Sequence, residues 1–179
     1  GAIYIVRDPR KIVSSLSHHY QLSNNEAWEF MNTENKAIIE KIENRYLGFN
    51  ALFSWQFHIK SWTTCEKFPV LTIKYEDLEN ETFETFEKVL EFIKRVSKIK
   101  ISFDINKAKN TIKSCQFERM QKLEIENGFR ESITNNKTKE KLRFFNLGNK
   151  NKYQNLLDKN LIDLINLKYQ EELKKFCYE

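Results

Sequence analysis

The first 20 residues, GAIYIVRDPRKIVSSLSHHY, contain the transition that decides the fold. Residues 2–6 are an apolar run rich in β-branched side chains, typical of a strand buried on both faces of a parallel sheet. Asp8 can cap a helix, Pro9 suits the first helical position, and apolar residues then recur at helical spacing. The stretch therefore predicts a buried strand followed directly by a helix.

Arg7 lies at the carboxyl end of this strand, immediately before the helix. Ligands bind at that place in open α/β sheets, and helix N-termini favour anions. The guanidinium fork matches phosphate, and Ser15, two helical turns beyond Asp8, lies on the same helix face as the cap. We predict that Arg7 and Ser15 hold one phosphate together. The alternative is an arginine paired with a surface carboxylate, beside an ordinary helix serine.

Length and composition indicate one helix-rich domain. The chain has 179 residues, is 40% hydrophobic, and contains 14 Phe but only 4 Gly and 2 Pro. The net charge of +5 comes from 30 basic residues, of which only 7 are arginine. Because no block of consecutive basic residues occurs, the charge argues against a nucleic-acid partner.

Cys65, Cys115 and Cys177 are too widely separated to predict a metal site or a disulfide framework, and free thiols fit a reducing compartment. The sequence shows neither a signal peptide nor a membrane-spanning run. These features predict a cytoplasmic protein of unknown oligomeric state. A membrane-anchored form stays open, because the chain begins inside a strand without Met.

Periodicity predicts further helices over residues 25–46, 47–65, 82–96, 106–117 and 158–176. A second strand is predicted over 70–75, and the polar stretch 127–141 is predicted to be mostly loop. His58 shares a helix face with two tryptophans, which favours a packed histidine over a catalytic base.

Only two strands of the parallel type are predicted, and two strands are too few for a sheet covered on both faces. We therefore expect the chain to be part of an α/β domain whose N-terminal strands are absent.

Four stretches, in order and covering nearly the whole chain, resemble sulfotransferases that use 3′-phosphoadenosine 5′-phosphosulfate (PAPS). IYIVRDPRKIVSS (3–15) resembles their 3′-phosphate-binding segment, and PVLTIKYEDL (69–78) resembles their strand ending in Tyr-Glu-Asp-Leu. SCQFERMQKLEIENGFRE (114–131) resembles the segment whose Phe stacks on or beside adenine. FFNLGNKNKYQNLL (144–157) resembles the C-terminal signature Phe-Phe-Arg-Lys-Gly followed by Gly-Asp-Trp.

The resemblance implies the C-terminal part of a three-layer α/β/α P-loop-type fold with a parallel sheet, with residues 1–179 as a single partial domain. It implies that Arg7 and Ser15 bind the 3′-phosphate, and that aromatic residues surround the adenine. The implied donor-binding residues are Arg7, Ser15, Tyr75, Phe117, Met120 and Gly148. The implied reaction transfers a sulfuryl group from PAPS to a hydroxyl or amine of a small-molecule or glycan acceptor, without a metal.

Two departures from the family pattern define the alternatives. The family's Lys-bearing loop for the 5′-phosphosulfate and its catalytic His precede the first matching segment, so we assign no catalytic residue and expect the chain alone to be inactive. His18 and His19 do not match the catalytic position.

The family's 3′-phosphate Arg and Lys correspond here to Asn146 and Leu147. Lys150 and Lys152 are candidate substitutes, although solvated loop charge is the simpler interpretation. The departures leave open a non-catalytic or decayed nucleotide-binding homologue. A helical binding protein without nucleotide is the third alternative.

Overall fold

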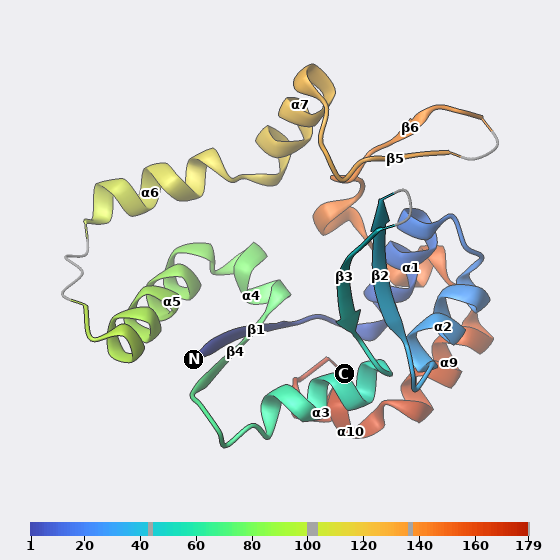
Figure 1. Ribbon diagram of the computed structural model, residues 1–179, viewed down its shortest axis with the longest axis horizontal. Coiled ribbons are helices and arrows are strands. Elements are labelled where there is room, and N and C mark those ends of the chain that lie inside the picture. The colour runs from blue at the N-terminus through green and yellow to red at the C-terminus, as the bar shows by residue number, and fades with distance from the viewer. Residues whose placement is uncertain (43–44, 100–103, 136–137, 179) are drawn as a thin grey trace.

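The structure is a computed structural model that describes residues 1–42, 45–99, 104–135 and 138–178 (Figure 1). The strands are β1 (Ala2–Val6), β2 (Ala37–Ile42), β3 (Arg45–Ala51), β4 (Val70–Lys74), β5 (Ile133–Thr134) and β6 (Lys141–Leu142). The helices are α1 (Pro9–Tyr20), α2 (Asn24–Asn32), α3 (Trp55–Thr63), α4 (Tyr75–Asn80), α5 (Thr82–Ser97), α6 (Ile105–Ser114), α7 (Phe117–Asn127), α8 (Tyr153–Leu156), α9 (Lys159–Lys168) and α10 (Gln170–Lys175), with a 3-10 turn η1 (Gly148–Lys150).

β1 and β4 form the predicted parallel pair, in a register that runs from Ala2 beside Val70 to Val6 beside Lys74. Helix α3 packs against both strands and α5 against β4, on opposite sides of the pair in Figure 1. The prediction that β1 is buried on both faces is wrong. Ile3 and Ile5 are 39% and 51% exposed, whereas Tyr4, on the other face of the strand, packs against His58 and Trp62 of α3.

The prediction of one helix over residues 25–46 is wrong beyond Asn32. Helix α2 ends there, and β2 and β3 form an antiparallel hairpin instead. Its β-branched isoleucines suit a strand as well as a helical stripe, so the sequence pattern did not distinguish the two.

The helix predicted over 47–65 begins eight residues later than expected, at Trp55, because Ser54 caps α3 by accepting a hydrogen bond from the Phe57 amide.

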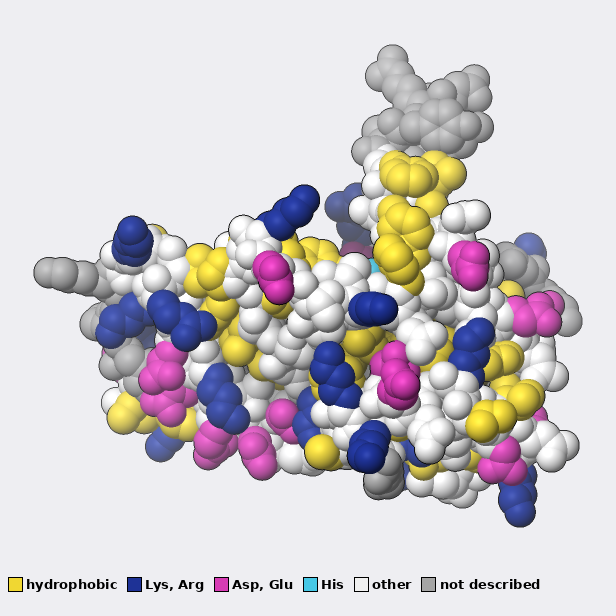
Figure 2. All heavy atoms as spheres, turned by 90° about the horizontal axis from the view of Figure 1, so that it is seen from below, with side chains coloured by type: hydrophobic (Ala, Val, Ile, Leu, Met, Phe, Trp, Pro, Cys, Tyr) yellow, Lys and Arg dark blue, Asp and Glu magenta, His cyan; other side chains and the backbone are white. Residues whose placement is uncertain are grey.

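The hairpin exposes a large apolar side chain, since Phe49 in β3 is 70% exposed. In Figure 2, hydrophobic side chains lie along the part of the molecule that projects upward from its body.

The remaining predictions need smaller corrections. The predicted helix 158–176 is two helices, α9 and α10, which meet at the non-helical Tyr169. Helix α7 was not predicted as a separate helix, and the 127–141 stretch contains the short pair β5–β6. Helices α5 and α6 agree with their predicted ranges to within a few residues.

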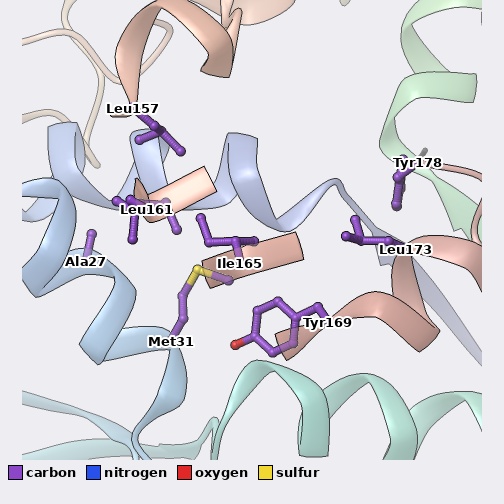
Figure 3. Packing of buried hydrophobic residues seen from close by; sticks show 9 residues of the cluster. Ala27, Met31, Leu157, Leu161, Ile165, Tyr169, Leu173 and Tyr178 are labelled. Carbon is purple, nitrogen blue, oxygen red and sulfur yellow. The ribbon is translucent and has the colours of Figure 1, made fainter. Parts of the chain in front are cut away.

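The main core lies where α1 and α2 meet the C-terminal helices (Figure 3). Its buried residues are Val13, Ala27, Met31, Leu157, Leu161, Ile165, Tyr169, Leu173 and Tyr178. Burying a large apolar side chain contributes about 1.5–3 kcal/mol, so this cluster fixes α1 firmly against the end of the chain. The helix that carries Ser15 therefore packs directly against this core.

All three cysteines are free thiols. Among the described residues, no helix has both the length and the apolar character needed to cross a membrane.

Candidate nucleotide-binding site

A cavity of about 1090 Å³ opens between the two strand-to-helix junctions, helices α6 and α7, and the segment 144–149. This volume is slightly above the usual range for small-molecule sites, about 300–1,000 Å³. The residues predicted from the sequence to bind the donor all line it: Arg7, Ser15, Tyr75, Phe117, Met120 and Gly148. Segments more than 100 residues apart in the chain thus converge on one site.

Arg7 owes its position to the register of the strand pair. Val6 lies beside Lys74, so the next residues, Arg7 and Tyr75, leave the two strands side by side. The Arg7 guanidinium carbon lies 4.3 Å from the Tyr75 ring centroid, and Nη1 donates to Ser15 Oγ at 3.2 Å.

Arg7 nevertheless keeps an unused donor. Its Nε is buried and has no hydrogen-bond partner, and no ion pair within the described ranges involves Arg7. The alternative of an arginine neutralised by a surface carboxylate therefore does not describe this residue. A partly buried guanidinium without a counterion among the described residues is suited to an anionic ligand.

The Tyr75 phenol stays neutral beside this charge. Burial raises the pKa of Tyr75, and the Arg7 guanidinium opposes that rise only in part. The ring therefore offers its face to Arg7 as a cation–π partner, an interaction worth about 0.5–2 kcal/mol.

Phe117 opens α7 and is held from two sides. The Phe145 ring meets it nearly edge-on, at 6.1 Å and 75° between ring planes. Gly148 has φ +53°, and a Cβ there would lie 2.9 Å from the Phe117 ring carbons. Only glycine tolerates both the left-handed backbone and this close approach. Gly148 therefore leaves the space that the Phe117 ring occupies.

Glu124 on α7 fixes the segment that carries Phe145. Its carboxylate accepts from the backbone amides of Phe144 at 2.6 Å and Phe145 at 2.9 Å, and from the Ser132 hydroxyl. Burial alone would raise the pKa of Glu124, but these donors lower it overall. Gln121 on the same helix donates to the carbonyl of Phe145 at 2.7 Å.

Asn151 is a member of the site that the sequence did not reveal. It is 3% exposed, lines the cavity, and hydrogen-bonds to Ser14 and Ser15 on α1. Its signal in the sequence is weak, because asparagines are common in this chain and its partners lie more than 130 residues away.

Positive charge in the cavity lining is sparse. Arg7 is the only Lys or Arg that lines it within the described ranges, where Glu79 and Glu118 also contribute. Asn146 and Leu147 line the cavity as the sequence placed them, whereas Lys150 and Lys152 are exposed and do not.

The second arginine of the Arg-Asp-Pro-Arg stretch has a different environment. Arg10 is 6% exposed and forms a two-point ion pair with Asp8, with Nη2 at 2.8 Å from Oδ2 and Nε at 2.9 Å from Oδ1. It also donates to Asn166 Oδ1 and to the Tyr178 carbonyl, and it lies over the Tyr153 ring. Arg10 is therefore part of the structural framework beneath the site.

The three histidines have different surroundings. His58 packs as the sequence predicted, against Trp62 and within 3.1 Å of the Tyr4 hydroxyl, and burial lowers its pKa. His18 and His19 line the cavity, and His18 Nε2 bonds to the Arg143 carbonyl at 2.9 Å. Among the described residues, no group of three or more His, Cys, Asp or Glu could hold a metal ion.

Comparison with known proteins decides the family. The model of the sulfotransferase domain family matches residues 2–177. The chain belongs to the sulfotransferase domain family. A search of curated proteins finds no match.

The family assignment agrees with the fold. A crystal structure of the mouse sulfotransferase SULT7A1 complexed with PAP superposes with a TM-score of 0.64, at 17% sequence identity. The superposition covers 96% of this chain but only 57% of the mouse protein. The chain therefore spans little more than half the length of that solved structure. The fold is thus the mixed α/β fold of a sulfotransferase, with the parallel pair β1–β4 in its sheet.

Proposed function

We propose that the cavity binds the 3′-phosphate and the adenine of PAPS, as that half of the donor site of a sulfotransferase. The observation that carries the proposal is the convergence of Arg7, Ser15 and Tyr75 with Phe117 and Gly148 on one cavity. PAPS supplies the sulfuryl group, and the residues that line the cavity hold its nucleotide. The acceptor is proposed to be a hydroxyl or amine of a small molecule or glycan.

The free donor on Arg7 supports a phosphate ligand. Charge-assisted bonds from arginine to phosphate are among the strongest in proteins, and the guanidinium is already oriented by Ser15 and Tyr75. Aromatic stacking of a base contributes about 1–3 kcal/mol in nucleotide sites, which suits Phe117. The mouse sulfotransferase with the matching fold was solved with PAP.

A second candidate function is supported by Asn146 and Leu147. These residues line the cavity where the family pattern has two cations, so a nucleotide-binding homologue without catalysis is the alternative. In both cases residues 1–179 are proposed to form one partial domain, and we expect no sulfuryl transfer from these residues alone.

The test is calorimetric titration of the 179-residue chain with adenosine 3′-monophosphate, adenosine 5′-monophosphate, adenosine 3′,5′-bisphosphate and adenosine. We expect the two ligands with a 3′-phosphate to bind at least about tenfold more tightly than the other two, which corresponds to one charge-assisted contact. Equal affinities for adenosine and its 3′-monophosphate would overturn the proposal.

The same chain, incubated with labelled PAPS and a panel of phenols, alcohols and amines, should show no turnover above a heat-treated control.

A further inference from the structure

Asn151 connects the segment that lines one side of the cavity to helix α1. Its side chain is almost fully buried, with 3% of the residue exposed. Nδ2 donates to the Lys11 carbonyl at 3.1 Å and to Ser15 Oγ at 3.2 Å, while Oδ1 accepts from Ser14 Oγ at 2.8 Å. One side chain thus makes three contacts with α1.

The Lys11 carbonyl determines which way the Asn151 amide faces. A carbonyl can only accept, so the amide nitrogen and not the amide oxygen must lie beside it. The second N–H of the same nitrogen then points to Ser15 Oγ. The direction of that bond is therefore fixed by the backbone of α1.

This bond determines the direction of the Ser15 hydroxyl proton. A hydroxyl has two acceptor lone pairs and one donor hydrogen. Both acceptor positions of Ser15 Oγ are occupied, by Arg7 Nη1 and by Asn151 Nδ2, each at 3.2 Å. In the part of the chain that the structure describes, no hydrogen bond uses Ser15 as the donor, and Ser15 lines the cavity.

We propose that Asn151 is a positioning residue, which makes Ser15 a hydrogen-bond donor to the 3′-phosphate of the nucleotide. The proposal rests on the proposed function of the cavity. Asn151 occupies one acceptor position of Ser15 and Arg7 the other, so the hydroxyl proton is left for the ligand. Because Arg7 is the only arginine among the described residues that line the cavity, a directed neutral donor adds selectivity for the 3′-phosphate.

The backbone does not require asparagine at this position. Residue 151 has φ −70° and ψ 84°, which any residue adopts. In the resemblance to sulfotransferases, counted without a gap, the Gly of the Gly-Asp-Trp signature corresponds to Asn151. Removal of the side chain therefore creates no backbone strain, and the role of Asn151 can be tested by substitution.

The test measures binding of adenosine 3′-monophosphate and 5′-monophosphate to the 179-residue chain by calorimetry. We expect Asn151→Ala to weaken the 3′-monophosphate by about five- to tenfold and to change the 5′-monophosphate by less than about twofold. Asn155→Ala, at an exposed asparagine outside the cavity lining, is the matched control and should change neither.

Asn151→Asp provides the second variant, because it keeps the shape and removes the donor. A carboxylate accepts from Ser15, which turns the hydroxyl proton away from the ligand. We expect a larger loss for the 3′-monophosphate than for the 5′-monophosphate, even if Asn151→Ala fails to fold.

A double-mutant cycle separates positioning from simple structural support. If Asn151 acts through Ser15, then Asn151→Ala and Asn151→Asp have no further selective effect in a Ser15→Ala background. Losses that are equal for both ligands, or additive with Ser15→Ala, would overturn the inference while leaving the site itself intact. A wild-type chain without preference for the 3′-phosphate would instead overturn the proposed function.

Discussion

Arg7 and Arg10 are three residues apart at one strand-to-helix junction, yet their surroundings are opposite. Arg10 is buried and has Asp8, Asn166, the Tyr178 carbonyl and the Tyr153 ring as partners. Arg7 lines the cavity and leaves its Nε without a partner.

This difference shows how an arginine that stabilises the fold can be distinguished from one that binds a ligand. A buried guanidinium whose three nitrogens all have partners within the chain stabilises the fold. A partly buried guanidinium held by a hydroxyl and a ring, without a counterion, retains its charge for a ligand.

The largest expected effect is on stability, from Arg10→Ala. The substitution leaves the Asp8 carboxylate buried at 4% exposure without its partner, and such losses cost about 3–5 kcal/mol. Urea denaturation measures the free energy of unfolding. Arg7→Ala should cost at most about 1 kcal/mol in the same experiment, because it strands no buried carboxylate. Similar losses for both variants would remove the distinction between the two arginines.

The next effect is on binding, from Arg7→Ala. Loss of charge-assisted bonds should weaken adenosine 3′,5′-bisphosphate by about 1.5–3 kcal/mol, roughly 10- to 150-fold, and weaken adenosine little. Calorimetric titration measures both ligands. Arg119→Ala removes an exposed charge outside the cavity lining and is the matched control. If the two variants lose equal affinity, Arg7 contributes only through the net charge of the chain.

The sequence predicted the Arg7 side of the site because its signals are local. The β-branched run, the Asp8 cap and the apolar spacing of α1 all lie within 20 residues. The second strand was equally clear, and pairing the two strands brings Arg7 beside Tyr75.

What the sequence did not predict depends on distant partners. Asn166 and Tyr178, which distinguish Arg10 from Arg7, lie 156 and 168 residues from it. The partners of Asn151 are 136 to 140 residues away. The β2–β3 hairpin was missed for a different reason, since its isoleucines fit a helical stripe as well as a strand.

A gain of binding is expected from added cations in the cavity lining, where Arg7 is the only Lys or Arg among the described residues. Asn146→Arg together with Leu147→Lys should tighten adenosine 3′,5′-bisphosphate by at least about tenfold, since each residue lines the cavity. The affinity for ADP, which lacks a 3′-phosphate, should change little, and the gain should persist at high salt.

An unchanged bisphosphate affinity would mean one of two things: the segment 144–149 lies away from the phosphate, or native lysines already serve it. Lys150→Ala with Lys152→Ala in the parent chain separates these cases. A loss of affinity there would identify the exposed lysines as the missing cations.

The smallest effect concerns Glu124, a second buried polar group whose partners are all within the chain. Its carboxylate holds the amides of Phe144 and Phe145, so Glu124→Gln exchanges one acceptor oxygen for a donor and should cost about 1 kcal/mol at neutral pH. The exposed Glu126, two residues further along α7, provides the control Glu126→Gln.

The pH dependence gives the sharper test of Glu124. Burial acts to raise its pKa, but the Ser132 hydroxyl and the two amides lower it overall below the ordinary value of 4.5. The unfolded chain therefore takes up the proton first as the pH falls. The stabilisation from the charged carboxylate is present above about pH 4.5 and is lost as the pH falls through the lowered folded-state pKa. Urea denaturation between pH 7 and pH 3 should show the wild-type chain losing its advantage over Glu124→Gln in this acidic window, while Glu126→Gln follows the wild type throughout. An advantage that stays constant down to pH 3 would show that the amides of Phe144 and Phe145 hold a neutral Glu124 as well as they hold its carboxylate.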